Sequence, residues 1–230
     1  MPPRSRYRGE SNAYDTANNK VYLGDMIWSW QVGNDLTGWT LGGATVPTIS
    51  ADGQIDLYDA TNLANQTSSA YFTLLNTLGQ LYCIFHCKFT RQADDTGADD
   101  YEFLAQIAPI ISAGRGLYWR GSNAVSYHVW YNNNYGGNSV ALTYPAPVVG
   151  QEHDLSIILT PKSSIVIMDN IKINEILTSN IGGAVLSATP YNDWLTANKT
   201  INFFVRHQAG QVSHYRVRDI RVSRLVGVSV

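Results

Sequence analysis

The chain has 230 residues, of which 44% are hydrophobic and only 15% are charged, and its formal net charge is −2. This apolar content can fill one large core, and the lack of a Pro-rich or charge-rich linker in the middle favours a single domain. The near-neutral balance excludes a whole-molecule attraction to nucleic acid or to an acidic membrane. With so few charges, much of the surface must be Ser, Thr, Asn, Gly and Tyr, which is common where proteins contact neighbours or glycans.

The N-terminal segment, residues 1–20, is polar, contains Arg and Pro, and shows no periodicity. It predicts an extended arm ahead of one domain of residues 21–230. Twenty extended residues reach on the order of 66 Å, far enough to cross a neighbouring subunit, and the alternative is an arm folded back on its own domain. Residues 1–10 contain no apolar run, so we expect no signal peptide and a protein made in soluble form in the cytoplasm. The arm residues expected to bind a partner are Arg4, Arg6, Tyr7, Arg8 and Tyr14.

From residue 21 onward, short alternating or apolar runs are broken by Gly, Pro, Asn and Asp, which predicts an all-β domain. In the first run Met26, Trp28 and Trp30 fall on one face of a strand, and Trp39 follows a turn at Gly38. So many strands call for two packed sheets, and residues 189–197 are compatible with one short helix. Further strands are expected at residues 54–58, 70–75, 81–91, 101–111, 116–120, 125–131, 154–160, 165–169, 171–177, 201–207 and 214–225.

The last run changes its phase of alternation. Tyr215 and Val217 alternate in one phase, and Ile220 and Val222 alternate in the other. A β-bulge at residues 218–219 would bring both pairs to the core.

The two cysteines, Cys83 and Cys87, are four residues apart in an alternating run. Their Cα atoms would lie roughly 13 Å apart along a strand, too far for a disulfide. We therefore expect reduced core cysteines, which suits assembly inside a cell. His86 would point to the opposite face from both thiols, so no metal site is expected there, and no cofactor is expected.

Four segments, residues 150–160, 164–173, 201–205 and 215–222, resemble the closing half of concanavalin-A-like and laminin-G-like jelly-roll sandwiches. In that superfamily a strand that begins with His precedes a strand that ends in Asp-Gly or Asp-Asn, and a final strand returns to pair with the first. With Gly38-Trp39-Thr40 the resemblance covers most of residues 35–225. It implies an all-β, two-sheet antiparallel jelly roll. The polar arm and the reduced cysteines also resemble bacteriophage structural proteins that use such sandwiches as capsid decoration, tail or fibre modules.

The acidic residues argue against catalysis. Enzymes on this fold usually place carboxylates two residues apart on one strand, because an acid and a nucleophile must flank one bond. The four glutamates, at positions 10, 102, 152 and 175, do not form the Glu-x-Asp-x-x-Glu pattern. The five histidines show no zinc spacing, and the sequence alone assembles no Ser/His/Asp triad. The acidic residues 94–102 could hold calcium or form a loop that stays in water by its own charge repulsion.

Two aromatic and amide-rich stretches fit sugar binding, since an aromatic face stacks on the C–H side of a sugar ring and Asn amides bond hydroxyls. The alternatives are that these aromatic residues fill the core around a simple turn, or that they contact protein. The basic last strand could face nucleic acid, but no recognition helix accompanies it, and a solvent face or a subunit contact with the acidic loop explains it as well. The predicted ligand-binding residues are Trp119, Trp130, Tyr131, Asn132, Asn133, Asn134, Tyr135 and Trp194.

The sequence therefore favours a non-enzymatic structural protein of a virion, assembled through its arm with other subunits and able to contact host glycans. The first alternative is a lectin-like, carbohydrate-binding module. A polysaccharide hydrolase or lyase is the second alternative.

Overall fold

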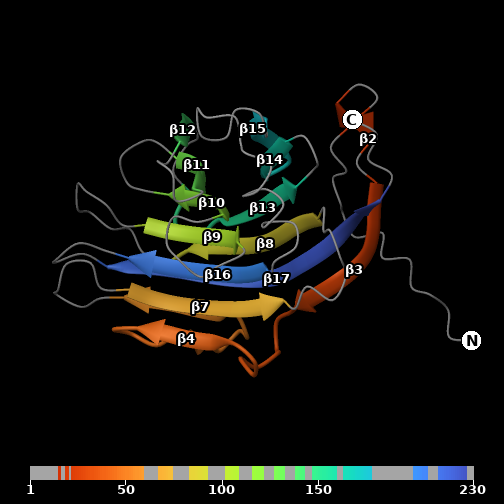
Figure 1. The fold of residues 1–230 in the computed structure, drawn as a ribbon. Coiled ribbons are helices and arrows are strands. Elements are labelled where there is room, and N and C mark those ends of the chain that lie inside the picture. Colours follow the sequence, from red (N-terminus) through yellow and green to blue (C-terminus); the bar gives the residue numbers. More distant parts are fainter. Residues whose placement is uncertain are drawn as a thin grey trace, which may run out of the picture.

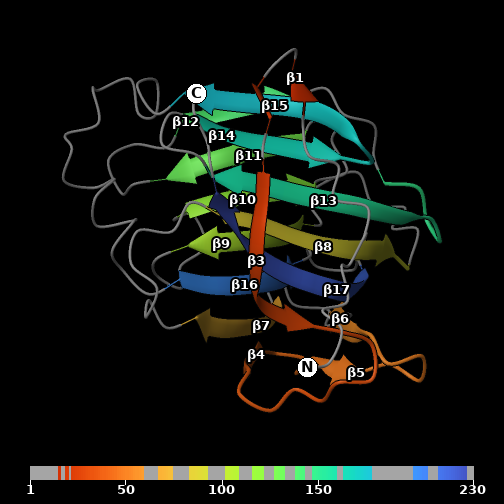
Figure 2. The same ribbon diagram turned by 90° about the vertical axis from the view of Figure 1, so that its right-hand side faces the viewer.

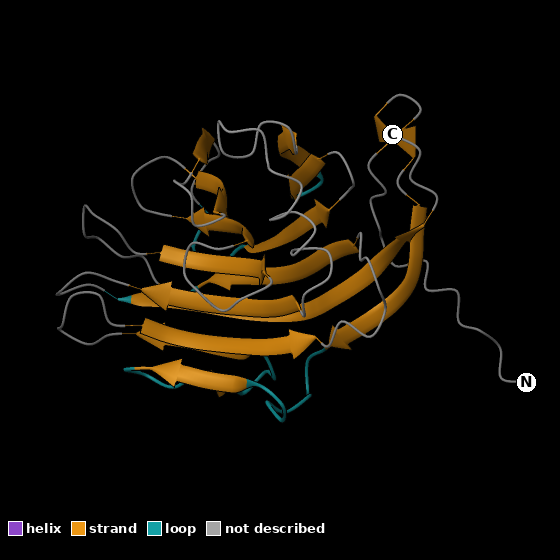
Figure 3. Ribbon diagram, in the orientation of Figure 1, coloured by secondary structure: helices purple, strands orange, loops and turns teal. Residues whose placement is uncertain are grey.

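In the computed structural model every regular element that is described is a β-strand (Figure 3). The strands form two antiparallel sheets that pack against each other (Figure 1), so the prediction of an all-β, two-sheet sandwich is confirmed. The structure describes residues 15–16, 19–20, 22–59, 67–74, 83–92, 102–108, 116–121, 127–132, 138–142, 147–159, 163–177, 199–206 and 212–226.

The first sheet has seven strands in the order β12-β11-β10-β9-β16-β7-β4. Its strands are β4 (Thr40–Gly43), β7 (Thr67–Leu74), β9 (Glu102–Ala108), β10 (Gly116–Gly121), β11 (Tyr127–Asn132), β12 (Asn138–Leu142) and β16 (Lys199–Arg206).

The second sheet has eight strands, with seven in the order β15-β14-β13-β8-β17-β6-β5 and β3 paired to β17. These strands are β3 (Tyr22–Trp30), β5 (Thr48–Ile49), β6 (Ile55–Asp59), β8 (Cys83–Arg91), β13 (Glu152–Leu159), β14 (Ser163–Met168), β15 (Ile171–Leu177) and β17 (Ser213–Val226). Figure 2 shows this sheet from its own side of the sandwich, with β3 in front. A separate two-residue ladder joins β1 (Asp15–Thr16) to β2 (Asn19–Lys20), inside the segment predicted as an arm.

Strand β17 is long enough to pair with two strands along one of its edges. Residues 213–217 pair with β6 and residues 220–226 pair with β3, while β8 lies along the other edge. The register shifts between Arg218 and Arg221, and Asp219 has a φ of +49°. All four side chains of the two alternating pairs are buried. The bulge therefore keeps both pairs in the core, as the sequence predicts. The ends of β17 and β3 run together beyond the body of the sandwich (Figure 1).

Aromatic side chains from both sheets meet in the core. The ring of Phe203 on β16 lies 6.0 Å from Phe85 on β8 and 6.2 Å from Trp39. Trp28 stacks on Phe72 at 4.7 Å and packs at the margin of this cluster. Large apolar rings buried between two sheets contribute about 1.5–3 kcal/mol each relative to exposure, so this contact holds the sandwich together.

One prediction on β3 is wrong. Met26 was expected on the same face as Trp28 and Trp30, but its side chain is 56% exposed whereas Trp30 is 3% exposed. The register with β17 shifts between Val222 and Ser223, so that Trp28 pairs with Val222 and Met26 with Ser223. An extra residue in a strand reverses the alternation beyond it, and Met26 is thereby turned to solvent.

A two-residue turn joins β14 to β15. Asp169 and Asn170 have φ values of +50° and +67°, which Asx residues adopt more readily than other non-glycine residues. Asp169 also donates its backbone N–H to the carbonyl of Asp154 at 2.9 Å, which holds the turn against β13.

Candidate functional site

Polar and aromatic residues form one continuous row across the seven-stranded sheet. In an antiparallel sheet, residues directly opposite each other on neighbouring strands share a row, and successive rows belong to opposite faces. The polar row, as we call it, consists of Thr40, Tyr71, Asn202, Gln106, Tyr118, Trp130 and Ser139, in order from β4 to β12. It crosses all seven strands without one aliphatic residue.

The polar row lies on the outer face of its sheet. Its neighbours on β16, Ile201 and Phe203, are fully buried in the core, so alternation turns Asn202 away from the core. Asn202 is 7% exposed, Tyr71 is half-buried and Thr40 is exposed. Thr40 therefore meets solvent fully and Tyr71 in part, whereas the amide of Asn202 is buried.

Four of the predicted ligand-binding residues lie on strands of this sheet. Trp119 is on β10, and Trp130, Tyr131 and Asn132 are on β11. Trp130 belongs to the polar row, whereas Trp119 pairs with Ala105 in the next row. The other four lie outside the described residues: Asn133, Asn134, Tyr135 and Trp194. The aromatic site therefore stays a prediction.

The remaining expectations about partners fall outside the described residues as well. These are the arm residues Arg4, Arg6, Tyr7, Arg8 and Tyr14, residues 94–101 of the acidic loop, and the possible helix at residues 189–197.

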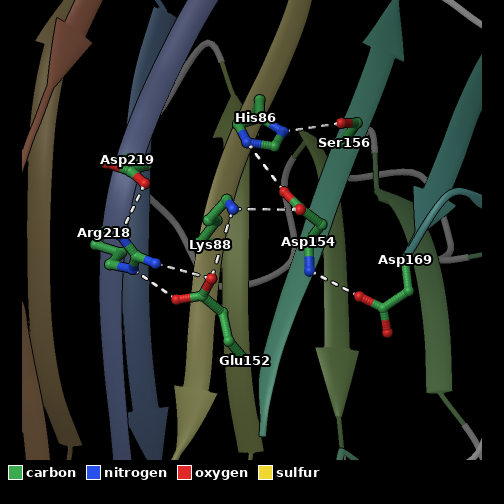
Figure 4. A network of polar contacts seen from close by, with 8 residues as sticks. All are labelled: His86, Lys88, Glu152, Asp154, Ser156, Asp169, Arg218 and Asp219. Carbon is green, nitrogen blue, oxygen red and sulfur yellow. Dashed lines mark hydrogen bonds and ion pairs between the residues drawn. The ribbon is translucent and has the colours of Figure 1, made fainter. Parts of the chain in front are cut away.

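The outer face of the eight-stranded sheet carries charged side chains that pair with one another (Figure 4). Arg218 on β17 donates two hydrogen bonds to Glu152 on β13, at 2.6 and 2.9 Å, and a third to Asp219 at 3.1 Å. Lys88 on β8 lies between two carboxylates, 3.5 Å from Glu152 and 3.6 Å from Asp154. These contacts tie β8, β13 and β17 together through their side chains.

A second charged group ties β6 to β17. Asp56 lies 2.7 Å from Nε2 of His214 and accepts a hydrogen bond from Nε of Arg216 at 3.0 Å. Burial alone would raise the pKa of Asp56, but the hydrogen bonds and charges of His214 and Arg216 outweigh it and lower the pKa. The pKa of Glu152 is lowered in the same way, since burial is outweighed by the hydrogen bond and charge of Arg218. Two arginines of the basic last strand, Arg216 and Arg218, thus have partners on their own sheet.

His86 makes the contacts that the sequence did not suggest. Its Nδ1 lies 3.1 Å from the hydroxyl of Ser156, the residue directly opposite it on β13, and its Nε2 lies 3.2 Å from Oδ1 of Asp154 (Figure 4). The sequence alone assembles no Ser/His/Asp group, and strand pairing brings these three residues together. The sequence could not show it, because Ser156 and His86 are 70 residues apart and meet only through the register of β8 and β13.

His153 faces inward and has a structural role. Its Nδ1 lies 2.7 Å from Oδ2 of Asp169, and its ring stacks on Phe89 at 5.6 Å. Asp169 also accepts a hydrogen bond from the backbone N–H of Asp154 at 2.8 Å. The strand that begins with His and the turn that begins with Asp, which carry the jelly-roll resemblance, are thus joined directly.

The thiols and the acidic groups offer no metal centre within the described residues. No group of three or more His, Cys, Asp or Glu side chains is gathered there in a way that could hold an ion. Cys83 and Cys87 are buried and form no disulfide, as predicted. Burial raises the pKa of Cys87 well above its usual value, which leaves a neutral, unreactive thiol. Nor does this part of the chain contain a helix with the length and apolar character needed to cross a bilayer.

Sequence reasoning missed Tyr71 and Asn202. A usable signal was present, because Asn202 interrupts the apolar run Ile201-Asn202-Phe203 with an amide in a strand that is otherwise hydrophobic. What the sequence could not supply was the alignment of this amide with Tyr71, 131 residues earlier, since only the pairing of β16 with β7 brings them together.

The comparisons with known proteins identify the fold. No family model matches the sequence, and no curated protein matches it. Among solved structures, the chain is similar to SCLam, a non-specific endo-β-1,3(4)-glucanase from family GH16, with a TM-score of 0.60 and 10% identity over 87% of this chain and 91% of that one. It is similar to the carbohydrate recognition domain of Emp46p (TM-score 0.59, 11% identity, 88% and 97% covered). It is also similar to alginate lyase A1-II′ of polysaccharide lyase family 7 (TM-score 0.56, 12% identity, 83% and 96% covered). The fold is a two-sheet, antiparallel jelly roll, as the resemblance implied.

Two sequence-based predictions about function need correction against these similarities. The chain was expected to be a virion structural protein and not an enzyme. The similar structures are instead a glucanase, a transglycosylase, alginate lyases and a carbohydrate recognition domain, which favours the carbohydrate-active alternative over the virion role. The error arose because a polar N-terminal segment and reduced cysteines occur in many unrelated proteins.

Proposed function

We propose that this chain is a carbohydrate-active protein that holds a polysaccharide against the outer face of the seven-stranded sheet. The observation that carries the proposal is the polar row, which crosses the sheet with hydroxyl, amide, phenol and indole residues in register. The names of the similar structures support it, since they include enzymes of polysaccharides and a carbohydrate recognition domain.

The chemistry of the described residues suits a sugar chain. Sugar rings present C–H groups on their faces and hydroxyls at their edges, so their partners combine aromatic rings with groups that both donate and accept hydrogen bonds. Tyr71 supplies a half-buried ring, and it lies between the hydroxyl of Thr40 on one side and the amide of Asn202 on the other. Adjacent strands lie about 4.8 Å apart, so seven strands span about 29 Å, enough for several sugar units.

The first test measures binding of the chain to a panel of soluble polysaccharides. Tyr71→Ala should weaken binding about 2- to 13-fold, the loss expected for one ring contact of about 0.5–1.5 kcal/mol. Tyr58→Ala is the matched control, since Tyr58 is 40% exposed on β6 of the other sheet and should leave binding unchanged. Absence of binding to every polysaccharide, or equal effects of the two substitutions, would contradict the proposal.

A second candidate is a lyase reaction, and the composition of the sheet favours it over hydrolysis. The seven strands contain one carboxylate residue, Glu102, whereas hydrolysis by a pair of carboxylates requires two. Elimination from a uronate instead needs a base for the proton next to the carboxyl group and donors that stabilise the charge that develops. Tyr, His, Arg and amide residues, which these strands do contain, can serve in those roles.

The two reactions give different products. A lyase takes a proton from the uronate ring as the glycosidic C–O bond breaks, which leaves a double bond that absorbs ultraviolet light. A hydrolase adds water and yields a reducing end without that absorbance. We expect absorbance to rise with acidic polysaccharides, and new reducing ends without absorbance would exclude the lyase.

A further inference from the structure

We propose that Ser156, His86 and Asp154 form a second chemical site, on the outer face of the eight-stranded sheet, in which Ser156 acts as a nucleophile toward small carboxylic esters. The imidazole contacts the hydroxyl through one ring nitrogen and the carboxylate through the other (Figure 4). The hydrogen bond to Nδ1 places a base beside the hydroxyl, which is what activation of a serine needs, and the carboxylate lies 3.2 Å from the other ring nitrogen without a hydrogen bond to it. It is independent of the polar row, which lies on the other sheet.

The register of two strands fixes the geometry. Ser156 and Asp154 are two residues apart on β13 and share a face, and His86 on β8 lies directly opposite Ser156. Two hydrogen bonds with Asp169 hold the backbone of Asp154. Asp154 donates its backbone N–H to the Asp169 carboxylate, and its carbonyl accepts the backbone N–H of Asp169. Because β13 pairs with β8 and β14 along both edges, the three groups sit on a rigid support.

The imidazole is in the state that a base needs. Burial lowers the pKa of His86, the charges of Arg221 and Lys88 lower it further, and the charges of Asp154 and Asp219 oppose them. At neutral pH His86 is therefore uncharged. With the proton on Nε2, facing Asp154, the lone pair on Nδ1 can accept the hydroxyl proton of Ser156.

Reagents can reach the site from solvent. The side chain of His86 is 21% exposed and that of Asp154 is 37% exposed, and Ser156 is half-buried. Lys88 is 3.6 Å from Asp154, and Nε of Arg221, opposite His86 in the register, has no hydrogen-bond partner within the described part of the chain. Both cations act on the imidazole, where their charge disfavours its protonation.

The reaction balances without a cofactor. The Ser156 oxygen bonds to the acyl carbon as Nδ1 of His86 takes the hydroxyl proton, and the ester C–O bond then breaks as that proton passes to the leaving alcohol. Water then attacks the acyl carbon as Nδ1 of His86 takes one of its protons. The bond between that carbon and the serine oxygen breaks, and Nδ1 returns the proton to the serine oxygen, which releases the carboxylic acid and restores the serine.

The test uses the full chain and a fluorophosphonate probe, which forms a P–O bond to an activated serine with loss of fluoride. We expect one adduct per chain, mapped to Ser156 by peptide mass, and none in Ser156→Ala. His86→Gln should slow labelling by about 100-fold or more, the usual contribution of a general base. Hydrolysis of 4-nitrophenyl acetate should follow the same order among the variants.

Ser29→Ala is the matched control, since Ser29 lies in the same cross-strand row on β3, on the far side of Arg221 from His86. It should label like the unmodified chain. Thermal unfolding of each variant checks the fold, and Ser156→Ala removes only one oxygen. Absence of labelling in the unmodified chain, or equal labelling of the unmodified chain and His86→Gln, would overturn the proposal.

Discussion

The two outer faces of the sandwich use polar residues in opposite ways. On the eight-stranded sheet, charged groups from β6, β8, β13 and β17 are paired with one another, as Arg218 is with Glu152 and Arg216 with Asp56. On the seven-stranded sheet, the polar row consists of uncharged residues. One face pairs its charged groups with one another, whereas the other carries a row of uncharged polar and aromatic residues.

The difference teaches where to seek a ligand on a sandwich with few charges. Exposed ion pairs contribute little to stability, since desolvation and side-chain entropy offset most of their attraction. Removing uncharged hydroxyls and amides from water costs less free energy than removing charged groups, so they suit a surface that binds and releases an uncharged sugar chain. Both faces nevertheless depend on the same core.

The largest expected effect is at that shared core. Phe203→Ala should destabilise the protein by about 3–5 kcal/mol, because it removes the ring that contacts both Phe85 and Trp39. Phe204→Ala, one residue along β16 on the outer face, should cost about 1 kcal/mol. Chemical denaturation measures both. Equal losses would mean that the assignment of faces on β16 is wrong, and with it the position of the polar row.

Acid should weaken the charged face selectively. The folded-state pKa values of Asp56 and Glu152 are lowered, so their contribution is present above the unfolded carboxyl pKa and is lost as pH falls through the folded value. Urea midpoints should therefore fall below about pH 4. Asp56→Asn and Glu152→Gln should reduce the dependence of the urea midpoint on pH, whereas Tyr71→Phe on the other sheet should leave it unchanged. If the urea midpoint still falls as steeply with pH in both variants, other groups cause the loss of stability in acid.

His86 should produce a second, smaller pH effect. Its pKa is lowered in the folded protein, so the unfolded chain binds the proton more readily and stability falls as pH drops through about 6.5. His86→Gln should abolish this decline, as followed by urea midpoints between pH 8 and 5. The same decline in the variant would show that another group is responsible.

A single ion pair should matter less. Arg218→Ala should cost about 0.2–1 kcal/mol at low salt, because Arg218 and Glu152 are each about one-third exposed. The cost should shrink in 1 M salt, where charges are screened within about 3 Å. A loss that is independent of salt would indicate that the arginine acts through packing.

The smallest effect tests whether the faces are independent. Arg218→Ala should leave polysaccharide affinity within about twofold of the unmodified chain, since it contacts only its own sheet. Titration of the polysaccharide preferred by the unmodified chain would measure this. A larger change would mean that the two sheets are coupled.

The elements that the sequence predicted well are those with a local signal. The alternation of Cys83 to Arg91 predicts a strand, and the change of phase in β17 predicts its bulge, because both depend on neighbours in the chain. Strand β12 was not predicted, since Asn138-Ser139-Val140-Ala141-Leu142 has only a weak pattern. Met26 was misplaced because the shift opposite Ser223 leaves no trace in the sequence of β3.

The candidate sites were harder to predict for a physical reason. The aromatic and amide side chains between positions 117 and 135 were recognised from the sequence. Tyr71 and Asn202 come to the same sheet only through the pairing of β16 with β7 and β9. The contact of His86 with Ser156 is likewise a product of register. A sequence shows which groups are available, whereas non-local pairing decides which of them meet.

The bulge in β17 also gives this strand a tolerance to a change in length. Residues 219 and 220 together lie opposite Cys87, so loss of the single codon for Asp219 would leave Tyr215, Val217, Ile220 and Val222 in one regular alternation, all still facing the core. A one-residue deletion beyond the bulge, at Arg221, would instead turn Val222 to the outer face, so among distant relatives we expect changes of length in this strand to fall at the bulge.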